Sequence, residues 1–132
     1  MSIRRSLIAG FAALGLIAAG AAGVWAQGEW KAPASEKSKK NPEKGPAAVA
    51  AGKKSAETNC IACHGPGGKG DGVAAAALTP KPADWTSARV QSETDGEIFW
   101  KIANGRGPMP PWKHLPEKER WDLIAFIRSL KK

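Results

Sequence analysis

The sequence predicts a small all-α fold organised around one short motif. Three segments have the composition and termini of helices, and no part of the chain has the pattern of a strand-rich α/β domain. Loops rich in glycine and proline join these segments. The motif, Cys60-Ile61-Ala62-Cys63-His64, follows the first of them and holds both cysteines of the chain. A chain of 132 residues accommodates one small domain with appendages.

The first predicted helix covers residues 46–59. Its alanine-rich sequence favours a helix, and it ends directly before Cys60. Gly52 lies inside it, where a glycine costs roughly 1 kcal/mol relative to alanine. We therefore expect another helix to approach closely at Gly52.

Two further helices are predicted, at residues 94–104 and 116–131. The first opens with Thr94-Asp95-Gly96-Glu97, the pattern of a capping box. The second has one apolar face. That face consists of Leu123, Phe126, Ile127 and Leu130. We expect its last part, Phe126 and Leu130, to pack against the first helix near Gly52.

Cys60, Cys63 and His64 form the C-x-x-C-H pattern at which haem c is attached. Two thiols at this spacing can each add to a vinyl group of one haem, and the adjacent histidine then lies under the iron as an axial ligand. A thiol–disulfide redox pair would need a thioredoxin-like context. A zinc site needs about four ligands, and an iron–sulfur cluster about four cysteines. The sequence therefore predicts one covalently attached haem c.

The second axial position of the iron has three candidate states. Met109 is the one methionine besides the initiator, and prolines flank it on both sides. His114 would give a His/His pair of lower potential, and an open position would permit gas binding or peroxide chemistry. We expect Met109 to be the ligand, because His/Met pairing is the arrangement of cytochromes c.

The surroundings of the haem are expected to come from two loops. A ligating histidine donates its other ring N–H to a carbonyl or carboxylate. Pro80 and Pro82 are rigid candidates for that carbonyl, and we favour Pro80. The apolar shell is expected to include three tryptophans: Trp85, Trp100 and Trp112.

The N-terminal third of the chain is predicted to lie outside this domain. Residues 1–26 combine Arg4-Arg5 with an apolar run, which is the pattern of a secretory signal peptide. The run at residues 7–26 is also long enough to span a bilayer, so a membrane anchor is the alternative. Residues 27–45 mix lysine, glutamate and proline and are predicted to be a flexible charged linker. We expect a periplasmic protein, or one anchored to the outer face of the inner membrane.

Residues 46–132 resemble a class I monohaem c-type cytochrome. The resemblance rests on Gly52, Cys60 to Gly65, Gly70-Asp71-Gly72, Leu78, Pro80, Pro82, Asn104-Gly105, Met109-Pro110 and Arg120-Trp121. The family often has an aromatic residue four positions before the first cysteine, where this chain has Ala56. The resemblance implies a helical fold wrapped around the haem. It also implies electron transfer, with Cys60 and Cys63 holding the haem and His64 and Met109 ligating its iron, and no catalytic residue.

The charge of the chain indicates what kind of partner it meets. The formal net charge is +8. Seven basic residues are expected near the haem edge: Lys53, Lys54, Lys69, Lys81, Lys101, Arg106 and Lys113. Such a rim would steer the protein to acidic redox partners, although ordinary surface charge explains the same residues. Export and the lack of a known motif exclude nucleic acid.

Two other functions stay open on the sequence alone. One is a haem enzyme or gas sensor with a displaceable sixth ligand. The other is an electron-transfer subunit of a larger oxidoreductase complex, which shares the same chemistry and differs in its partner.

Overall fold

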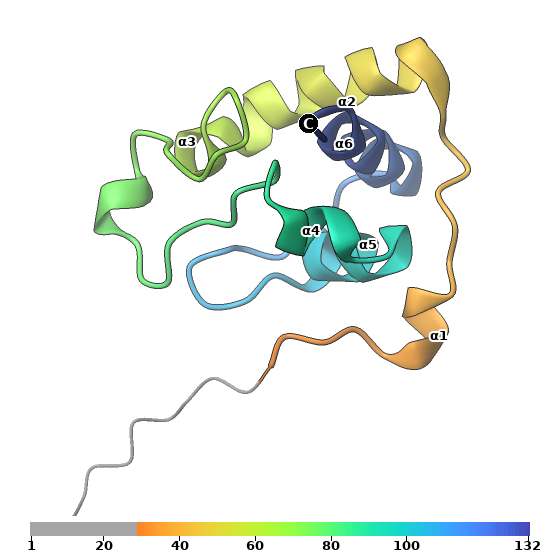
Figure 1. Ribbon diagram of the computed structural model, residues 1–132, viewed down its shortest axis with the longest axis horizontal. Coiled ribbons are helices and arrows are strands. Elements are labelled where there is room, and N and C mark those ends of the chain that lie inside the picture. The colour runs from red at the N-terminus through yellow and green to blue at the C-terminus, as the bar shows by residue number, and fades with distance from the viewer. Residues whose placement is uncertain (1–28) are drawn as a thin grey trace, which may run out of the picture.

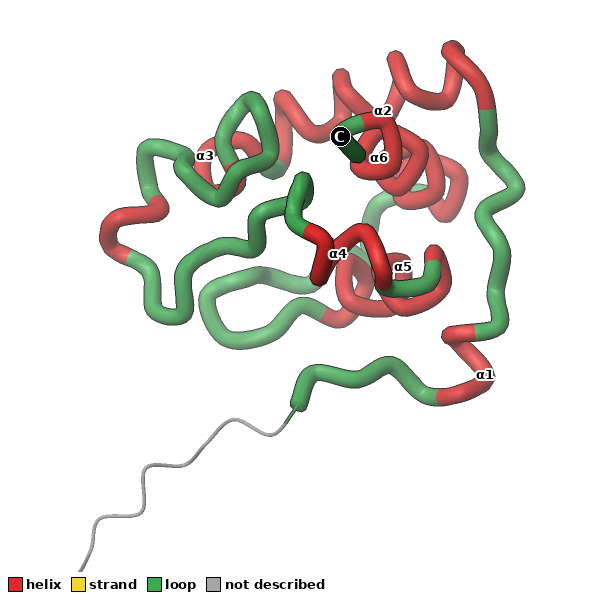
Figure 2. The backbone as a smooth tube through the Cα atoms, in the orientation of Figure 1, coloured by secondary structure: helices red, strands yellow, loops and turns green. Residues whose placement is uncertain are grey.

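The computed structural model describes residues 29–132, so the predicted signal peptide or anchor lies outside the described residues. The described chain is helical, and its one β-type pairing is an isolated bridge between Arg106 and Met109 (Figure 2). Within the same residues, no helix is both long enough and apolar enough to cross a membrane. The all-α prediction is confirmed for this part of the chain.

The longer helices lie at the top, in the middle and on the right of Figure 1, and long loops occupy its left side. In chain order they are α1 (Ala34–Lys37), α2 (Gly45–Asn59), α3 (Ile61–His64), the 3-10 turn η1 (Ala75–Ala77), α4 (Ala88–Ser92), α5 (Asp95–Asn104) and α6 (Glu117–Ser129). The helices α2, α5 and α6 are the three predicted from sequence, with ends within two residues of the predicted ones. The short elements α1, α3, η1 and α4 are additional.

The contact between α2 and α6 is the largest between any two helices of the described chain. A Cβ on Gly52 would lie 1.9 Å from the carbonyl oxygen of Asp122, so the two backbones meet where no side chain intervenes. One turn later, Ala56 is fully buried. The predicted close approach at Gly52 is therefore confirmed. The nearest atoms to Gly52 belong to the backbone of Asp122 and Leu123. Phe126 shares the buried core cluster with Ala56 of α2, and Leu130 packs against that cluster.

An apolar core joins α5 to α6. Phe99 of α5 stacks on Trp121 of α6, with ring centroids 3.8 Å apart. The Arg120 guanidinium lies 4.4 Å from the centre of the Phe99 ring. Leu123 and Ile124 are among the most buried side chains of the domain. This core fixes the helices whose connecting loops form the site.

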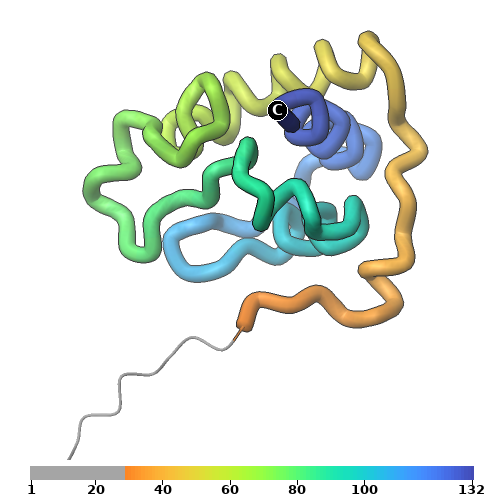
Figure 3. The backbone as a smooth tube through the Cα atoms, in the orientation of Figure 1, coloured from red at the N-terminus to blue at the C-terminus, as the bar shows by residue number. Residues whose placement is uncertain are grey.

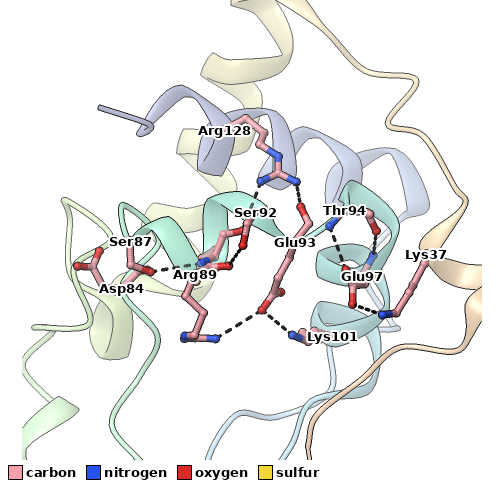
Figure 4. A network of polar contacts seen from close by, with 11 residues as sticks. Lys37, Asp84, Ser87, Arg89, Ser92, Glu93, Thr94, Glu97, Lys101 and Arg128 are labelled. Carbon is pink, nitrogen blue, oxygen red and sulfur yellow. Dashed lines mark hydrogen bonds and ion pairs between the residues drawn. The ribbon is translucent and has the colours of Figure 1, made fainter.

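The capping box at the start of α5 forms as predicted. The Thr94 hydroxyl accepts a hydrogen bond from the backbone N–H of Glu97 at 3.2 Å. In return, the Glu97 carboxylate accepts one from the backbone N–H of Thr94 at 3.1 Å (Figure 4). The pair satisfies two N–H groups that an uncapped helix leaves open.

Residues 29–44, here called the N-terminal strap, lie along the domain, which differs from the flexible linker predicted for residues 27–45. Figure 3 shows the strap passing beside α5 and then turning to the start of α2. Ala32 is buried. Asn41 is 6% exposed, and its side-chain amide donates to the Trp121 carbonyl at 2.9 Å. Composition did not reveal these few anchoring contacts in an otherwise polar segment.

Candidate functional site

A cavity of about 350 Å³ contains the residues of the predicted haem site. Its wall includes Cys60, Cys63 and His64 of the motif, and Met109 from a distant loop. Much of the remaining wall is apolar, as in Leu78, Pro82, Val90, Ile98, Ile102 and Leu123. The fold therefore brings together the predicted attachment sites and both predicted axial ligands, which the sequence separates by up to 49 positions.

The motif forms a tight helical turn immediately after α2. Cys60 is the C-cap of α2 and the N-cap of α3. The Cys60 carbonyl accepts hydrogen bonds from the N–H of Cys63 at 3.1 Å and of His64 at 2.9 Å. This turn places all three side chains on the cavity wall. The two cysteines are not joined by a disulfide in the described chain.

Burial distinguishes Cys60 from the thiol of a redox motif. Desolvation raises the pKa of Cys60 to about 11, and negative charge on Cys63 and Glu119 acts in the same direction. Reactive C-x-x-C thiols have a lowered pKa instead. The environment of Cys60 suits an uncharged thioether better than a thiolate nucleophile.

His64 is oriented by a backbone carbonyl. It is 8% exposed, and its Nδ1 lies 3.0 Å from the carbonyl oxygen of Ala83. A carbonyl can only accept, so Nδ1 carries the proton and Nε2 keeps a lone pair for a metal. Burial lowers the pKa of His64, while the hydrogen bond to Ala83 opposes the shift. The ring is therefore held neutral, in the tautomer that an axial ligand requires.

The carbonyl that orients His64 belongs to Ala83, and the prediction of Pro80 for this role is wrong. The carbonyl of Pro82, the other candidate, lies against Gly70, where a Cβ would be 2.4 Å from the oxygen. Pro80 lies on the wall of the cavity instead.

Trp85 packs directly against the imidazole. Its ring is stacked on His64 with centroids 4.5 Å apart and planes 22° from parallel. Phe126 packs against Trp85 in a T-shaped arrangement, with ring centroids 6.3 Å apart. Gly68 has a φ of +69°, and a Cβ there would lie 2.6 Å from Trp85, so glycine is needed for this packing. These contacts restrict the rotation of His64.

The tryptophans of the cavity differ in part from the predicted set. Trp85 and Trp112 border it, as expected. Trp100 lies outside the wall formed by the described residues. Trp30, from the N-terminal strap, takes part in the wall and was not predicted. The signal that could have found it is a large aromatic side chain in an otherwise polar segment.

Met109 is held in the cavity wall by a tight loop after α5. Arg106 and Met109 exchange two backbone hydrogen bonds of 2.9 and 3.1 Å. Gly105, with φ +61°, lies so close that a Cβ would be 2.4 Å from the Met109 carbonyl. His114 is exposed, and its ring faces Trp112 at 5.5 Å rather than the cavity. Of the two candidates for the second axial position, Met109 borders the cavity and His114 does not take part in its wall.

Basic residues border one part of the cavity. Lys81, Lys101 and Arg106 from the predicted rim take part in the wall. Lys101 is paired with Glu93 at 2.7 Å, and Arg89 reaches the same carboxylate at 3.4 Å (Figure 4). The positive charge at the cavity is thus partly balanced by Glu93.

A family model described as cytochrome c oxidase, cbb3-type, subunit III matches residues 47–127, well over half of the chain. Among solved structures, a chain of the Kuenenia stuttgartiensis reducing HAO-like protein complex Kustc0457/Kustc0458 is 28% identical, with a TM-score of 0.63. The match covers 70% of this chain and 47% of that one, so the chain spans about half the length of this relative.

A structure described as the KustC0563 c-type cytochrome is 27% identical, with a TM-score of 0.54. That match covers 61% of this chain and 98% of the other. No curated protein matches the sequence. The family match begins inside α2, so the N-terminal strap precedes it.

Proposed function

Because the chain belongs to the family described as subunit III of cbb3-type cytochrome c oxidase, a family of c-type cytochromes, we propose that it carries electrons through one haem c. Cys60 and Cys63 would attach the haem, and His64 and Met109 would ligate its iron. The observation that carries this proposal is the single cavity in which all four side chains meet. When bound, the haem supplies a one-electron redox centre.

The residues present fit such a group. The cavity wall offers two free cysteine thiols, a neutral imidazole with a free Nε2, and a thioether. His64 is fixed by Ala83 and Trp85, and Met109 by the bridge to Arg106. Ligands held this firmly need little rearrangement between two oxidation states. This rigidity suits electron transfer better than substrate turnover.

We propose redox proteins as partners, in the periplasm or at the outer face of the inner membrane. The net charge of +8 supports partners with acidic docking surfaces. The likeness to a chain of a multi-subunit complex supports a second form of the same proposal, a subunit of a larger oxidoreductase. Purification from membranes under mild detergent separates the two: a free carrier elutes alone, and a subunit co-elutes with its complex.

The ligand assignment is tested by Met109→Ala with His114→Ala as the matched control. In the purified ferric protein, Met109→Ala should remove the weak long-wavelength band of methionine ligation, and the ferrous variant should bind carbon monoxide. His114→Ala should behave as the wild type. A wild type that binds carbon monoxide readily at neutral pH would contradict six-coordinate ligation. It would favour the haem enzyme or gas sensor instead.

A further inference from the structure

The N-terminal strap is fixed to the domain at several points. The Asn41 amide donates to the Trp121 carbonyl at 2.9 Å. The Lys37 ammonium lies 2.9 Å from the Glu97 carboxylate of α5, whose side chain is 14% exposed (Figure 4). Close beside it, the Glu36 carbonyl lies against Gly96, where any Cβ would collide with it. The strap therefore runs in one path across α5.

These contacts deliver Trp30 to the edge of the haem cavity. Trp30 is half-buried and borders the cavity. It also borders a second, more open hollow, together with Pro80 and Arg106. Because Trp30 borders both the interior cavity and the surface hollow, it lies at the opening between them.

Two cations hold the indole of Trp30 in place. The Lys101 ammonium lies 5.4 Å from the ring centroid, and the Arg106 guanidinium carbon lies 6.0 Å from it. Both distances are within the range of cation–π attraction. Lys101 is itself held by Glu93 at 2.7 Å, and its side chain is only 14% exposed. The position of the indole ring is thus fixed by the backbone path of the strap and by the two cations of the cavity wall.

We propose that Trp30 is a lid on the open side of the haem cavity, held shut by the strap. This inference rests on the proposed function, since it assumes a haem in the cavity. The indole excludes water and small ligands from that edge. An apolar cover disfavours the more highly charged ferric state, so it raises the reduction potential.

The strap lies outside the segment that matches the family model, which begins at residue 47. The lid therefore lies outside the part of this chain that the family model matches. It also explains why a polar segment, rich in lysine and glutamate, keeps a tryptophan and a buried alanine at residues 30 and 32.

The test compares the haem-loaded full chain with Trp30→Ala, and with Trp100→Phe as a tryptophan control outside the cavity. Imidazole is added to the ferric protein, and its association rate is followed in the absorbance spectrum. We expect Trp30→Ala to associate several-fold faster and to have a lower reduction potential. Trp100→Phe should match the wild type in both measurements. Equal rates and potentials for wild type and Trp30→Ala would overturn the lid.

A second variant separates the lid from a general loss of stability. Lys37→Met removes the ion pair to Glu97 and leaves every cavity residue in place. If the strap holds Trp30 shut, Lys37→Met shifts the imidazole rate in the same direction as Trp30→Ala, by a smaller factor. It should also speed hydrogen exchange of amides in residues 29–41. An unchanged rate and unchanged exchange in Lys37→Met would contradict the role of the strap.

Failure of the lid proposal can be told apart from failure of the proposed ligation by Met109. If the iron lacked Met109, the wild-type ferric spectrum would lack the methionine band, whatever the state of Trp30. The lid fails only when the variants and the wild type show the same access and the same potential.

Discussion

Arg128 of α6 donates from Nε to the Asp95 carboxylate of α5 at 2.8 Å. The same guanidinium donates to the carbonyl of Gln91 at 3.1 Å. It also donates to the carbonyl of Glu93, at the end of α4 (Figure 4). One side chain therefore joins three helices, and it satisfies carbonyls that the end of α4 leaves without partners.

Replacing Arg128 by methionine should destabilise the domain by about 2–3 kcal/mol, because charge-assisted hydrogen bonds to several acceptors are lost. Urea unfolding measures the change. Arg89→Met is the matched control, since Arg89 is 67% exposed and has one ion pair of 3.4 Å. It should cost no more than about 0.5 kcal/mol. Equal losses for the two variants would contradict the bridging role.

Gly52→Ala should separate α2 from α6. The new Cβ would lie 1.9 Å from a backbone oxygen, which cannot move aside as a flexible side chain can. We expect a loss of about 3 kcal/mol or more in the free energy of unfolding, from strain at a packed contact. Gly67→Ala is the control, because its Cβ would meet only the Lys69 side chain, at 3.9 Å. Gly67→Ala should leave the unfolding midpoint nearly unchanged.

Glu97 should make stability fall as the pH falls. The Lys37 ammonium and the backbone N–H of Thr94 hold the pKa of Glu97 below its ordinary value. A depressed pKa contributes stability that is present above the unfolded pKa of about 4.3 and is lost as the pH drops through the folded pKa.

Glu97→Gln removes this dependence in unfolding experiments between about pH 6 and pH 3, a window that brackets the unfolded pKa of glutamate. The variant should be less stable than the wild type at the upper end of that window, and the difference should shrink at the lower end. Glu57→Gln is the control, because Glu57 is exposed and its ion pair to Lys53 is 4.0 Å long. A constant difference for Glu97→Gln across the pH range would refute the linkage.

Replacing both cysteines should abolish covalent haem attachment. In the Cys60→Ala, Cys63→Ala double variant no thiol remains in the chain, so no thioether can form. Haem staining after denaturing electrophoresis should give no band for this variant. His114→Ala keeps both thiols and should stain as the wild type does. A stained band in the double variant would disprove attachment through Cys60 and Cys63.

Local sequence patterns predicted the parts of the fold that depend on local chemistry. Thr94 and Glu97 predicted the start of α5, because a capping box involves only residues three positions apart. Gly52 predicted a close helix contact, because glycine inside a helix is otherwise unfavourable. The spacing of Cys60, Cys63 and His64 predicted which side chains share one wall of the cavity.

The remaining features depend on contacts between distant segments. Ala83 orients His64 through a contact between residues 19 positions apart, and no pattern around Pro80 encodes that pairing. Trp30 reaches the cavity because Asn41 and other strap residues find partners on α5 and α6. Such long-range pairings cannot be read from composition, which predicted a flexible segment there.

The path of residues 29–44 also sets how far the domain can travel from whatever precedes it. As a free coil, residues 30–44 would have a root-mean-square span of roughly 20 Å, and the domain could rotate about its start at Gly45. Because the segment lies against α5 and Asn41 is hydrogen-bonded to Trp121, it does not give the domain this freedom of rotation. The point about which the domain can rotate is then Trp30, at the mouth of the cavity, and not Gly45. Any segment that precedes residue 29 would therefore join the domain beside the mouth of the cavity, so that the domain would rotate about its redox edge.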